Sequence, residues 1–301
     1  MPAVSERRQP SGTAFALRDP LAWYDLAAIV RASEDAGYGA LFLPEIAGRD
    51  AFVTLGAIAG ETRHLLLGTG VVPMGSRATM LTAMAAATVH ERSLGRLILG
   101  IGTGGAGAGA LERLRERVRD LRALLGGETA EVDGGRRRLT LAPGSHVPIW
   151  ISALGQRAMR LAGEMADGVL LNWCPPERVA FAAARIREGA EAAGRDPGEV
   201  AIGVYVRSWV GEDEAGAWPA LAEAAAQYAA IPAYARQFEQ VGLGAEDPEA
   251  LVRAVCAIGD EARDRIEAFR EAGADLPVVY PVAMADTAAS IEATLSALAP
   301  G

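Results

Sequence analysis

Short apolar runs alternate with longer stretches of helical spacing along most of the chain. The short runs predict buried strands, and the longer stretches predict amphipathic helices. The predicted strands are Thr13–Leu17, Ala40–Glu45, Leu65–Val72, Arg96–Gly102, Val147–Ser152, Gly168–Trp173, Val200–Val210 and Leu276–Ala283. The predicted helices are Pro20–Ala36, Asp50–Thr62, Arg77–Ser93, Ala108–Leu125, Gln156–Met165, Pro176–Ala193, Asp260–Ala272 and Thr287–Leu298. Eight such units close most simply into an α/β (β/α)8 TIM barrel, with a doubly wound open sheet as the alternative.

Two stretches interrupt this alternation. Residues Glu128–Leu141 have the pattern of a small β-hairpin outside the main sheet, with Asp133 and Gly134 in its turn. The mostly helical stretch 213–257 makes the connection after the seventh strand too long for one crossover helix, so we expect a helical insertion there. No low-complexity linker divides the chain. We therefore expect residues 1–301 to form a single barrel domain that contains the insertion.

The C-terminal ends of the strands are where a TIM barrel places its functional residues. Glu45 ends the second predicted strand, where a carboxylate can transfer a proton to or from a bound ligand. An ion pair with Arg49 or Arg77 is the alternative role for this side chain. Aromatic residues near the same rim can wall a pocket for a flat small-molecule substrate, or can pack in the core instead. They are Trp173, Tyr205, Trp209 and Tyr280.

Glycine-bearing turns follow two of the predicted strands. Gly100–Gly105 fits the GxGxxG pattern, but it lies in the fourth unit, and the acidic residue expected about 20 positions later falls inside a helix. The pattern therefore disfavours a Rossmann site, although backbone N–H groups here can still face a polar cofactor. The turn Ser152–Met159, which carries Arg157, can hold a phosphate at a helix N-terminus or can be an ordinary loop.

The charge and composition exclude several classes of protein. A net charge of −9 argues against a nucleic-acid partner, because such partners are bound mainly through basic patches. The chain contains no lysine, which excludes Schiff-base chemistry and a standard P-loop. None of the three histidines follows a predicted strand, and the two cysteines form no ligand motif, so we expect no metal site.

The N-terminal residues MPAVSERRQPSG lack the apolar core of a signal peptide. No apolar run reaches the roughly 18 residues that a membrane-spanning helix needs. We therefore expect a cytoplasmic protein without a membrane partner.

Three blocks of the chain carry a family resemblance. Leu41–Gly104 contains PE followed by GRDAF, then TRHLLLGTGV and LGRLILGIG. Val147–Asn172 contains VPIWIS and RAMRLAGEMADG, and Ile258–Pro281 supplies the last helix-and-strand pattern. Together they resemble the bacterial luciferase-like superfamily of flavin- and deazaflavin-dependent oxidoreductases. The GRDAF and LGTGV segments resemble its coenzyme F420-dependent branch, which includes the methylenetetrahydromethanopterin reductase-like enzymes.

The resemblance implies a TIM barrel that binds F420 at its mouth. It implies a non-proline cis peptide at Gly70–Val71, which would back the deazaflavin ring, and cofactor contacts at Thr103 and Gly104. It also implies phosphate contacts in the turn after the fifth strand, at Leu154, Gly155, Arg157 and Ala158. A homodimer is the assembly that the family implies.

The chain departs from its relatives at two positions. Where some relatives have a histidine after the acid of the second strand, this chain has Ile46, and where some have a glutamate after GTG, it has Gly105.

The implied activity is hydride transfer between deazaflavin C5 and a small organic substrate, with Glu45 as the proton-transfer residue. One alternative is an FMN-dependent monooxygenase that takes reduced flavin from a separate reductase and uses O2. The other is a barrel that binds flavin without turnover.

Overall fold

Eight parallel strands close into a barrel in this computed structural model, which describes residues 10, 12–18, 21–105, 107–211, 214–244 and 246–300. The strands are β1 (Ala14–Ala16), β2 (Ala40–Leu43), β3 (Leu66–Thr69), β5 (Leu97–Gly102), β8 (Ile149–Ser152), β9 (Gly168–Asn172), β10 (Ala201–Trp209) and β12 (Leu276–Pro281). Each pairs with the next, and β12 pairs with β1, which closes the ring. The predicted TIM barrel is confirmed, and the open-sheet alternative is wrong.

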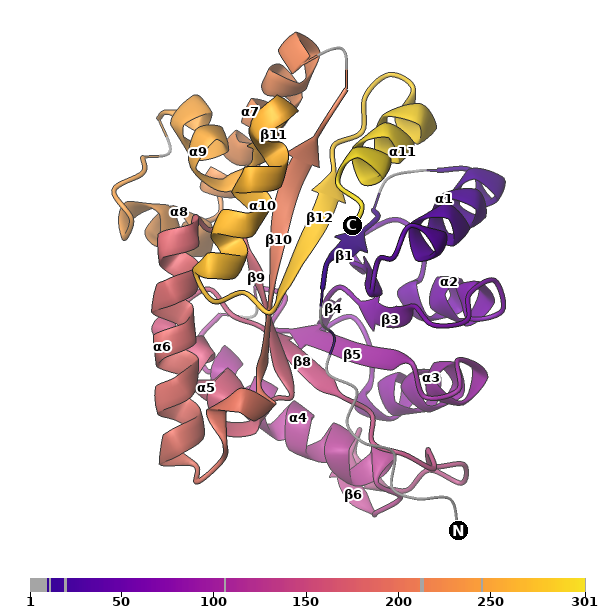
Figure 1. Ribbon diagram of the computed structural model, residues 1–301. Helices are drawn as coiled ribbons and strands as arrows, with labels where there is room; N and C mark the ends of the chain where they lie inside the picture. Colours follow the sequence, from indigo (N-terminus) through magenta and orange to yellow (C-terminus); the bar gives the residue numbers. More distant parts are fainter. Residues whose placement is uncertain are drawn as a thin grey trace.

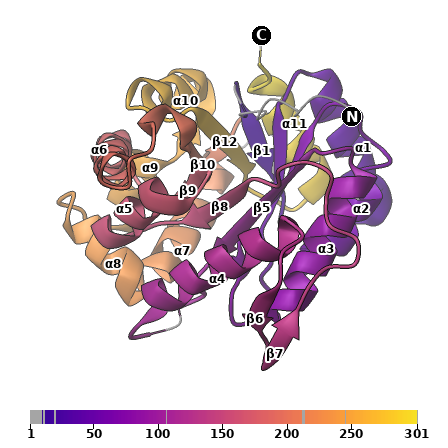
Figure 2. The same ribbon diagram turned by 90° about the horizontal axis from the view of Figure 1, so that it is seen from below.

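Helices surround the barrel on its outer face (Figures 1 and 2). They are α1 (Trp23–Asp35), α2 (Ala51–Ile58), α3 (Thr79–Arg92), α4 (Ala110–Leu125), α5 (Gln156–Met165), α6 (Pro176–Ala192), α10 (Ala262–Glu271) and α11 (Thr287–Ala297), with short 3-10 turns at Pro197–Glu199 and Gly259–Glu261. Glycines let α5 and α6 approach closely, since a Cβ on Gly163 would lie 1.9 Å from the carbonyl oxygen of Ile186. Among the described residues, no helix is long and apolar enough to span a bilayer.

Aromatic side chains fill the inside of the barrel. The rings of Phe42 and Trp150 lie 5.7 Å apart, and both are almost completely buried. Gly168 and Gly203 leave room for the Trp150 ring, because a Cβ on either would lie within 3.0 Å of it. The centre of the barrel is therefore packed, as in other TIM barrels, and open space is confined to its ends.

The predicted hairpin excursion is present outside the barrel, beside α3 and α4 (Figure 2). It consists of β6 (Ala130–Val132) and β7 (Gly135–Arg137), which pair antiparallel around Asp133 and Gly134. The Asp133 carboxylate accepts hydrogen bonds from the backbone N–H groups of Thr79 and Met80 at 3.0 and 2.8 Å. The hairpin turn therefore caps the N-terminus of α3, which lacks a side-chain cap of its own.

The predicted helical insertion is present between β10 and α10. It contains α7 (Glu214–Ala229), α8 (Pro232–Glu239) and α9 (Pro248–Val255), followed by β11 (Ala257–Ile258), which extends the sheet beside β10. Leu221, Phe238 and Leu251 give these helices an apolar cluster of their own, and this cluster also buries Trp173 from the barrel. The insertion therefore packs on the barrel next to the ends of β9 and β10 (Figure 1).

Candidate functional site

The chain bends sharply where β3 reaches the C-terminal rim of the barrel. The stretch predicted as one strand, Leu65–Val72, instead leaves the sheet after Thr69 and re-enters it as β4 (Val72–Pro73) beside β5. A Cβ on Gly70 would lie 2.6 Å from the backbone nitrogen of Pro44, so glycine is required for this close approach. Gly70 N–H donates to the Leu43 carbonyl at 2.7 Å, which holds the bend against β2.

The predicted cis peptide at Gly70–Val71 is wrong, because every peptide bond among the described residues is trans. The physical reason lies in the interrupted pairing of β3. The carbonyl of Val71 accepts from the backbone N–H of Glu45 at 3.3 Å, and Val72 then pairs opposite Ile101 of β5. Glycine and the strand break already turn the chain, so the bend does not need a cis bond that costs about 3–4 kcal/mol.

Four of the predicted cofactor residues lie together at this bend. We call Gly70, Val71, Gly102, Thr103 and Gly104 the glycine shelf. A Cβ on Gly102 would lie 2.5 Å from Val71 Cγ1 and 2.4 Å from the Ser152 hydroxyl oxygen, and a Cβ on Gly104 would lie 2.8 Å from Pro73 Cβ. Val71 and Thr103 are half-buried and Gly104 is exposed. The shelf is therefore a small-residue surface at the rim, formed by the ends of β3, β4 and β5.

The remaining predicted cofactor residues form the turn between β8 and α5. We call Leu154–Ala158 the phosphate turn. Gly155 is the N-cap of α5 and provides no side-chain cap, and Arg157 is exposed while Ala158 is buried. No side chain of the N-cap residue therefore occupies the first backbone N–H groups of α5. Such N–H groups at a helix N-terminus can bind a phosphate.

A second arginine, which the sequence did not reveal as a site residue, lies beside the phosphate turn. Arg178 of α6 is only 4% exposed, donates to the Leu154 carbonyl at 2.8 Å and lies 4.6 Å above the Phe181 ring. Burial lowers the pKa of Arg178 from its ordinary value. Arg178 and Phe181 line a cavity of about 640 Å³ that also includes Gln156. Arg178 thus brings a positive charge to the wall of this cavity next to the turn, and Glu177 brings a negative one.

The Glu45 carboxylate is held by Arg77. Arg77 Nε donates to Glu45 Oε1 at 2.8 Å, and Arg77 Nη2 donates to Oε2 at 3.1 Å. The backbone N–H of Ala51 reaches Oε2 at 3.3 Å, and Arg77 also pairs with Asp50. The hydrogen bond with Glu45 is the largest effect on the pKa of Arg77, which is raised. Of the two alternative ion pairs expected from the sequence, the one with Arg77 forms.

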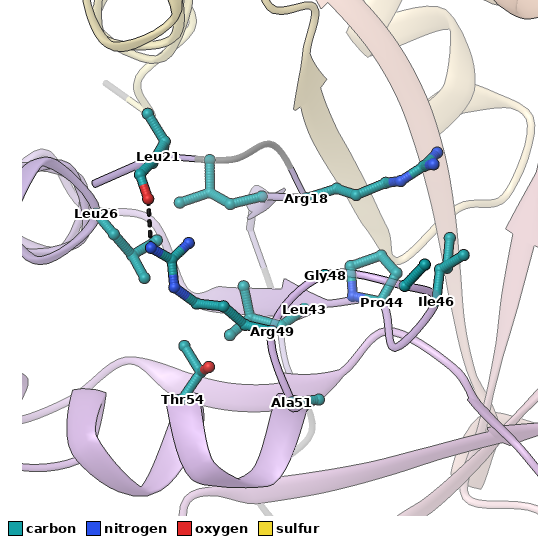
Figure 3. A pocket seen from close by; sticks show the side chains of 12 residues that line it. Arg18, Leu21, Leu26, Leu43, Pro44, Ile46, Gly48, Arg49, Ala51 and Thr54 are labelled. Carbon is teal, nitrogen blue, oxygen red and sulfur yellow. Dashed lines mark hydrogen bonds between the residues drawn. The ribbon is translucent and has the colours of Figure 1, made fainter. Parts of the chain in front are cut away.

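A cavity of about 760 Å³ opens at the ends of β1 and β2 (Figure 3). Pro44, Ile46 and Arg49 line it, and Arg49 donates to the Leu21 carbonyl. Arg18 reaches across the cavity towards Ile46 (Figure 3). The Glu45 carboxylate is turned the other way, towards Arg77. The cavity therefore has apolar and cationic walls.

Three of the four predicted aromatic residues gather around a buried arginine that the sequence analysis missed. Arg207 of β10 is 8% exposed, and its guanidinium carbon lies 4.7 Å from the Trp173 ring and 4.4 Å from the Tyr280 ring. Tyr205 packs against Tyr280 with ring centroids 5.6 Å apart, and burial raises the pKa of Tyr205 well above its ordinary value. The fourth aromatic residue, Trp209, makes no ring contact with this group within the described part of the chain.

The insertion completes the surroundings of Arg207. The ring centroid of Tyr228 in α7 lies 5.4 Å from the guanidinium carbon. Asn172 accepts a hydrogen bond from Arg207 Nη1 at 2.5 Å and donates one to the Tyr234 hydroxyl at 2.8 Å. Gln237 of α8 donates to the carbonyls of Asn172 and Trp173 at 3.0 and 2.6 Å. The sequence does contain a signal for Arg207. It is the one charged residue of β10, and it lies on the same strand face as Tyr205.

Within the described residues, no group of three or more His, Cys, Asp or Glu side chains has the arrangement of a metal site. Cys174 and Cys256 are both buried and free, and burial raises the pKa of each to about 12. Neither thiol is therefore prepared for nucleophilic chemistry near neutral pH.

Comparisons with known proteins give a consistent result. The profile of the Luciferase-like monooxygenase family matches residues 6–276. The 5,10-methylenetetrahydromethanopterin reductase of Methanolobus tindarius is 32% identical over 219 residues, which cover 68% of this chain and 66% of the relative. That of Archaeoglobus fulgidus is 33% identical over 188 residues, which cover 58% of this chain and 56% of the relative. The matched regions thus span less than two thirds of these two curated relatives.

Solved structures share the fold at low identity. The coenzyme F420-dependent tetrahydromethanopterin reductase from Methanopyrus kandleri superposes with a TM-score of 0.77 at 21% identity, over 94% of this chain and 97% of that one. An F420-dependent secondary alcohol dehydrogenase in complex with an F420–acetone adduct gives 0.78 at 18% identity, over 95% and 97%. At these identities the likeness establishes the barrel architecture.

Proposed function

The chain belongs to the luciferase-like monooxygenase family, and from that premise we propose that it is an F420-dependent oxidoreductase. Hydride would pass between C5 of the deazaflavin and a small organic substrate at the mouth of the barrel. The observation that carries this proposal is the glycine shelf beside the phosphate turn. Relatives that are named as F420-dependent enzymes or methylenetetrahydromethanopterin reductases support the choice of cofactor.

The residues at the rim fit such a cofactor. The glycine shelf has no large side chain, because Cβ atoms on Gly102 and Gly104 would collide with their neighbours, so the backbone near Val71 and Thr103 is open to a flat ring. The phosphate turn offers α5 backbone N–H groups and the exposed Arg157 to an anionic tail. When bound, F420 supplies the hydride chemistry, and the protein supplies binding, orientation and exclusion of water.

Glu45 remains our proposed proton-transfer residue. It lies two residues after β2, and the backbone N–H of Glu45 contacts the glycine shelf through the Val71 carbonyl. Two donors of Arg77 hold its carboxylate in one orientation, so proton transfer requires Glu45 to exchange one of these hydrogen bonds. A Glu45→Ala variant should lose most of its turnover. Full turnover in that variant, measured under saturating substrate, would remove Glu45 from the mechanism.

An FMN-dependent monooxygenase is the second candidate, and the family description favours it directly. The phosphate turn would serve the FMN phosphate in the same way, and a separate reductase would supply reduced flavin. A barrel that binds flavin without turnover is the third candidate, because Ile46 and Gly105 stand where some relatives have a histidine and a glutamate.

Anaerobic incubation with reduced F420 tests the proposal. We expect reoxidation of F420 when a panel of small ketones, aldehydes and imines is added, with one equivalent of reduced product for each cofactor oxidised. Oxygen consumption with reduced FMN, and none of this reoxidation, would favour the monooxygenase. Tight binding without reoxidation by any acceptor or by O2 would favour the non-catalytic barrel.

A further inference from the structure

We propose that Arg207 and the hydrogen-bond donors around it form a subsite that binds a carboxylate group of the substrate. This inference rests on the proposed function, since it assigns the substrate class of the same barrel mouth. It starts from the burial of Arg207, a residue that is 8% exposed although its guanidinium carries a full positive charge.

Arg207 has no carboxylate partner within 4.0 Å among the described residues. Its one hydrogen bond there joins Nη1 to Asn172 Oδ1. The rings of Trp173, Tyr228 and Tyr280 offset part of the cost of burying the charge through cation–π contacts. Buried guanidinium groups normally have a counter-ion, and here the described residues do not provide one.

Two further polar groups around Arg207, on Trp173 and Tyr205, have no hydrogen-bond partner among the described residues. They are the indole N–H of Trp173 and the hydroxyl of Tyr205, and both are buried. An indole N–H can only donate, as can a guanidinium. Unsatisfied buried groups of this kind require an explanation, and donors that gather around one cation are explained by a ligand rich in acceptor oxygens.

The geometry favours a carboxylate over a phosphate. Asn172 occupies Nη1, which leaves the Nε–Nη2 edge of the guanidinium as the edge for a ligand. That edge matches the two oxygens of a planar carboxylate in a bidentate pair. The single positive charge of Arg207 also balances one carboxylate, whereas a phosphate monoester carries roughly −1.5 to −2 charges at pH 7.

The subsite lies across the barrel mouth from the glycine shelf. In the strand order, β10 and β3 are separated by three strands on either side, so they are opposite each other in the ring. A substrate held through its carboxylate at Arg207 would therefore extend its reacting carbon towards the shelf. Arg207 acts in this arrangement as a binding and specificity residue.

Calorimetric titration of the purified full chain, without cofactor, tests the subsite. The probes are benzoate, its neutral analogue benzamide, and phenyl phosphate. We expect the wild-type protein to bind benzoate at least 10-fold more tightly than either of the other two. We expect Arg207→Met to lose at least 10-fold in benzoate affinity and to keep its weak affinity for benzamide.

Arg253→Met is the matched control, because Arg253 also lies over a tryptophan ring, that of Trp218 at 6.0 Å, but is exposed and paired with Glu249. It should bind benzoate as the wild type does. Equal benzoate affinity in Arg207→Met and wild type would overturn the proposal, as would preferred binding of benzamide or phenyl phosphate. If Arg207→Met does not fold, the wild-type preference among the three probes decides. Because no cofactor is present, failure here leaves F420 binding to be judged by its own titration.

Discussion

Gly102 shows how one residue without a side chain can shape the proposed cofactor surface. It separates the Val71 side chain from the Ser152 hydroxyl, and a Cβ placed there would lie within 2.5 Å of both. Ser152 is held in β8, whereas Val71 lies between β3 and β4, so Val71 is the neighbour that must give way. A side chain at position 102 should therefore push Val71 out over the glycine shelf.

Gly102→Val should weaken F420 binding at least 10-fold, which corresponds to about 1.4 kcal/mol. The measurement is a fluorescence titration of F420 with each variant. Gly75→Ala is the control, because Gly75 has open space around the position of a Cβ and should bind as the wild type does. Unchanged affinity in Gly102→Val would show that the cofactor does not use the glycine shelf.

Asp167 lies at the N-terminal end of the barrel, opposite the proposed cofactor surface, and it supports stability. Its carboxylate accepts from the backbone N–H of Ile149 at 2.8 Å and from Arg122 Nη2 at 2.9 Å, and it lies 3.1 Å from His146 Nε2. Burial acts to raise the pKa of Asp167, but the hydrogen bond with His146 and the charge of Arg122 together lower it below its ordinary value of 3.8.

Because the folded-state pKa of Asp167 is lowered, its contribution to stability is present above about pH 4 and is lost as the pH falls through the folded-state value. Asp167→Asn should lower the free energy of unfolding by about 3 kcal/mol at pH 7. The difference between variant and wild type should shrink as the pH drops below 4. Urea unfolding at several pH values measures this, and a difference that does not depend on pH would contradict the assigned role.

At the scale of elements, the insertion is joined to the barrel through α8. Gln237 is 3% exposed and donates to two carbonyls at the end of β9, while Tyr234 accepts from Asn172. These contacts place Tyr228 of α7 against Arg207 as well. The insertion therefore forms one wall of the barrel mouth.

Gln237→Leu should loosen this wall without unfolding the barrel, because it removes two hydrogen bonds that are worth about 1 kcal/mol each. Hydrogen exchange should become faster at the backbone amides of α8, while β10 and β12 keep their protection. Gln227→Leu is the control, since Gln227 bonds to Glu223 on the exposed surface of α7 and to no other described residue. Equal protection of α8 in both variants would contradict the structural role of Gln237.

Most elements could be predicted because each leaves a periodic signal of its own. Apolar runs predicted all eight barrel strands, and Asp133–Gly134 predicted the hairpin turn. The break after Thr69 could not be predicted in this way, because it depends on the contact of Gly70 with Pro44, a residue of another strand. The cis peptide that we inferred from the family resemblance at the same place is wrong. The chain bends there with trans peptide bonds, and Val72 pairs with Ile101 after the bend.

The candidate site was predictable only in part. The predicted cofactor residues follow strand ends, so the fold itself brings Val71, Thr103 and the phosphate turn to one rim. Arg207 was missed, because its significance depends on what surrounds it. These surroundings are the rings of Trp173 just after β9, of Tyr228 in α7 and of Tyr280 in β12, with no carboxylate among the described residues. Neighbours of that kind come together only when the insertion packs on the barrel.

At the scale of the whole molecule, an exposed apolar surface lies on α2 and α3. Val53 is 73% exposed, and Leu81 and Met84 are each 50% exposed on the neighbouring helix. Exposed apolar side chains on adjacent helices are typical of an interface between protein subunits. We therefore propose that this surface forms the homodimer that the family resemblance implies.

Light scattering after gel filtration should give twice the 31.3 kDa mass of one chain. The double variant Leu81→Asp, Met84→Asp should give the monomer mass, since it places charges in the proposed interface. Leu141→Asp is the control, because Leu141 is also exposed, at 60%, but lies outside α2 and α3. A wild-type protein of monomer mass would contradict the proposed dimer.

Binding of F420 at the barrel mouth is the central claim, and parallel equilibrium titrations with F420 and FMN test it most directly. We expect F420 to bind at least 10-fold more tightly than FMN, and we expect Gly102→Val and Arg157→Ala each to weaken that binding. Tight binding of FMN together with no measurable binding of F420 would contradict the account.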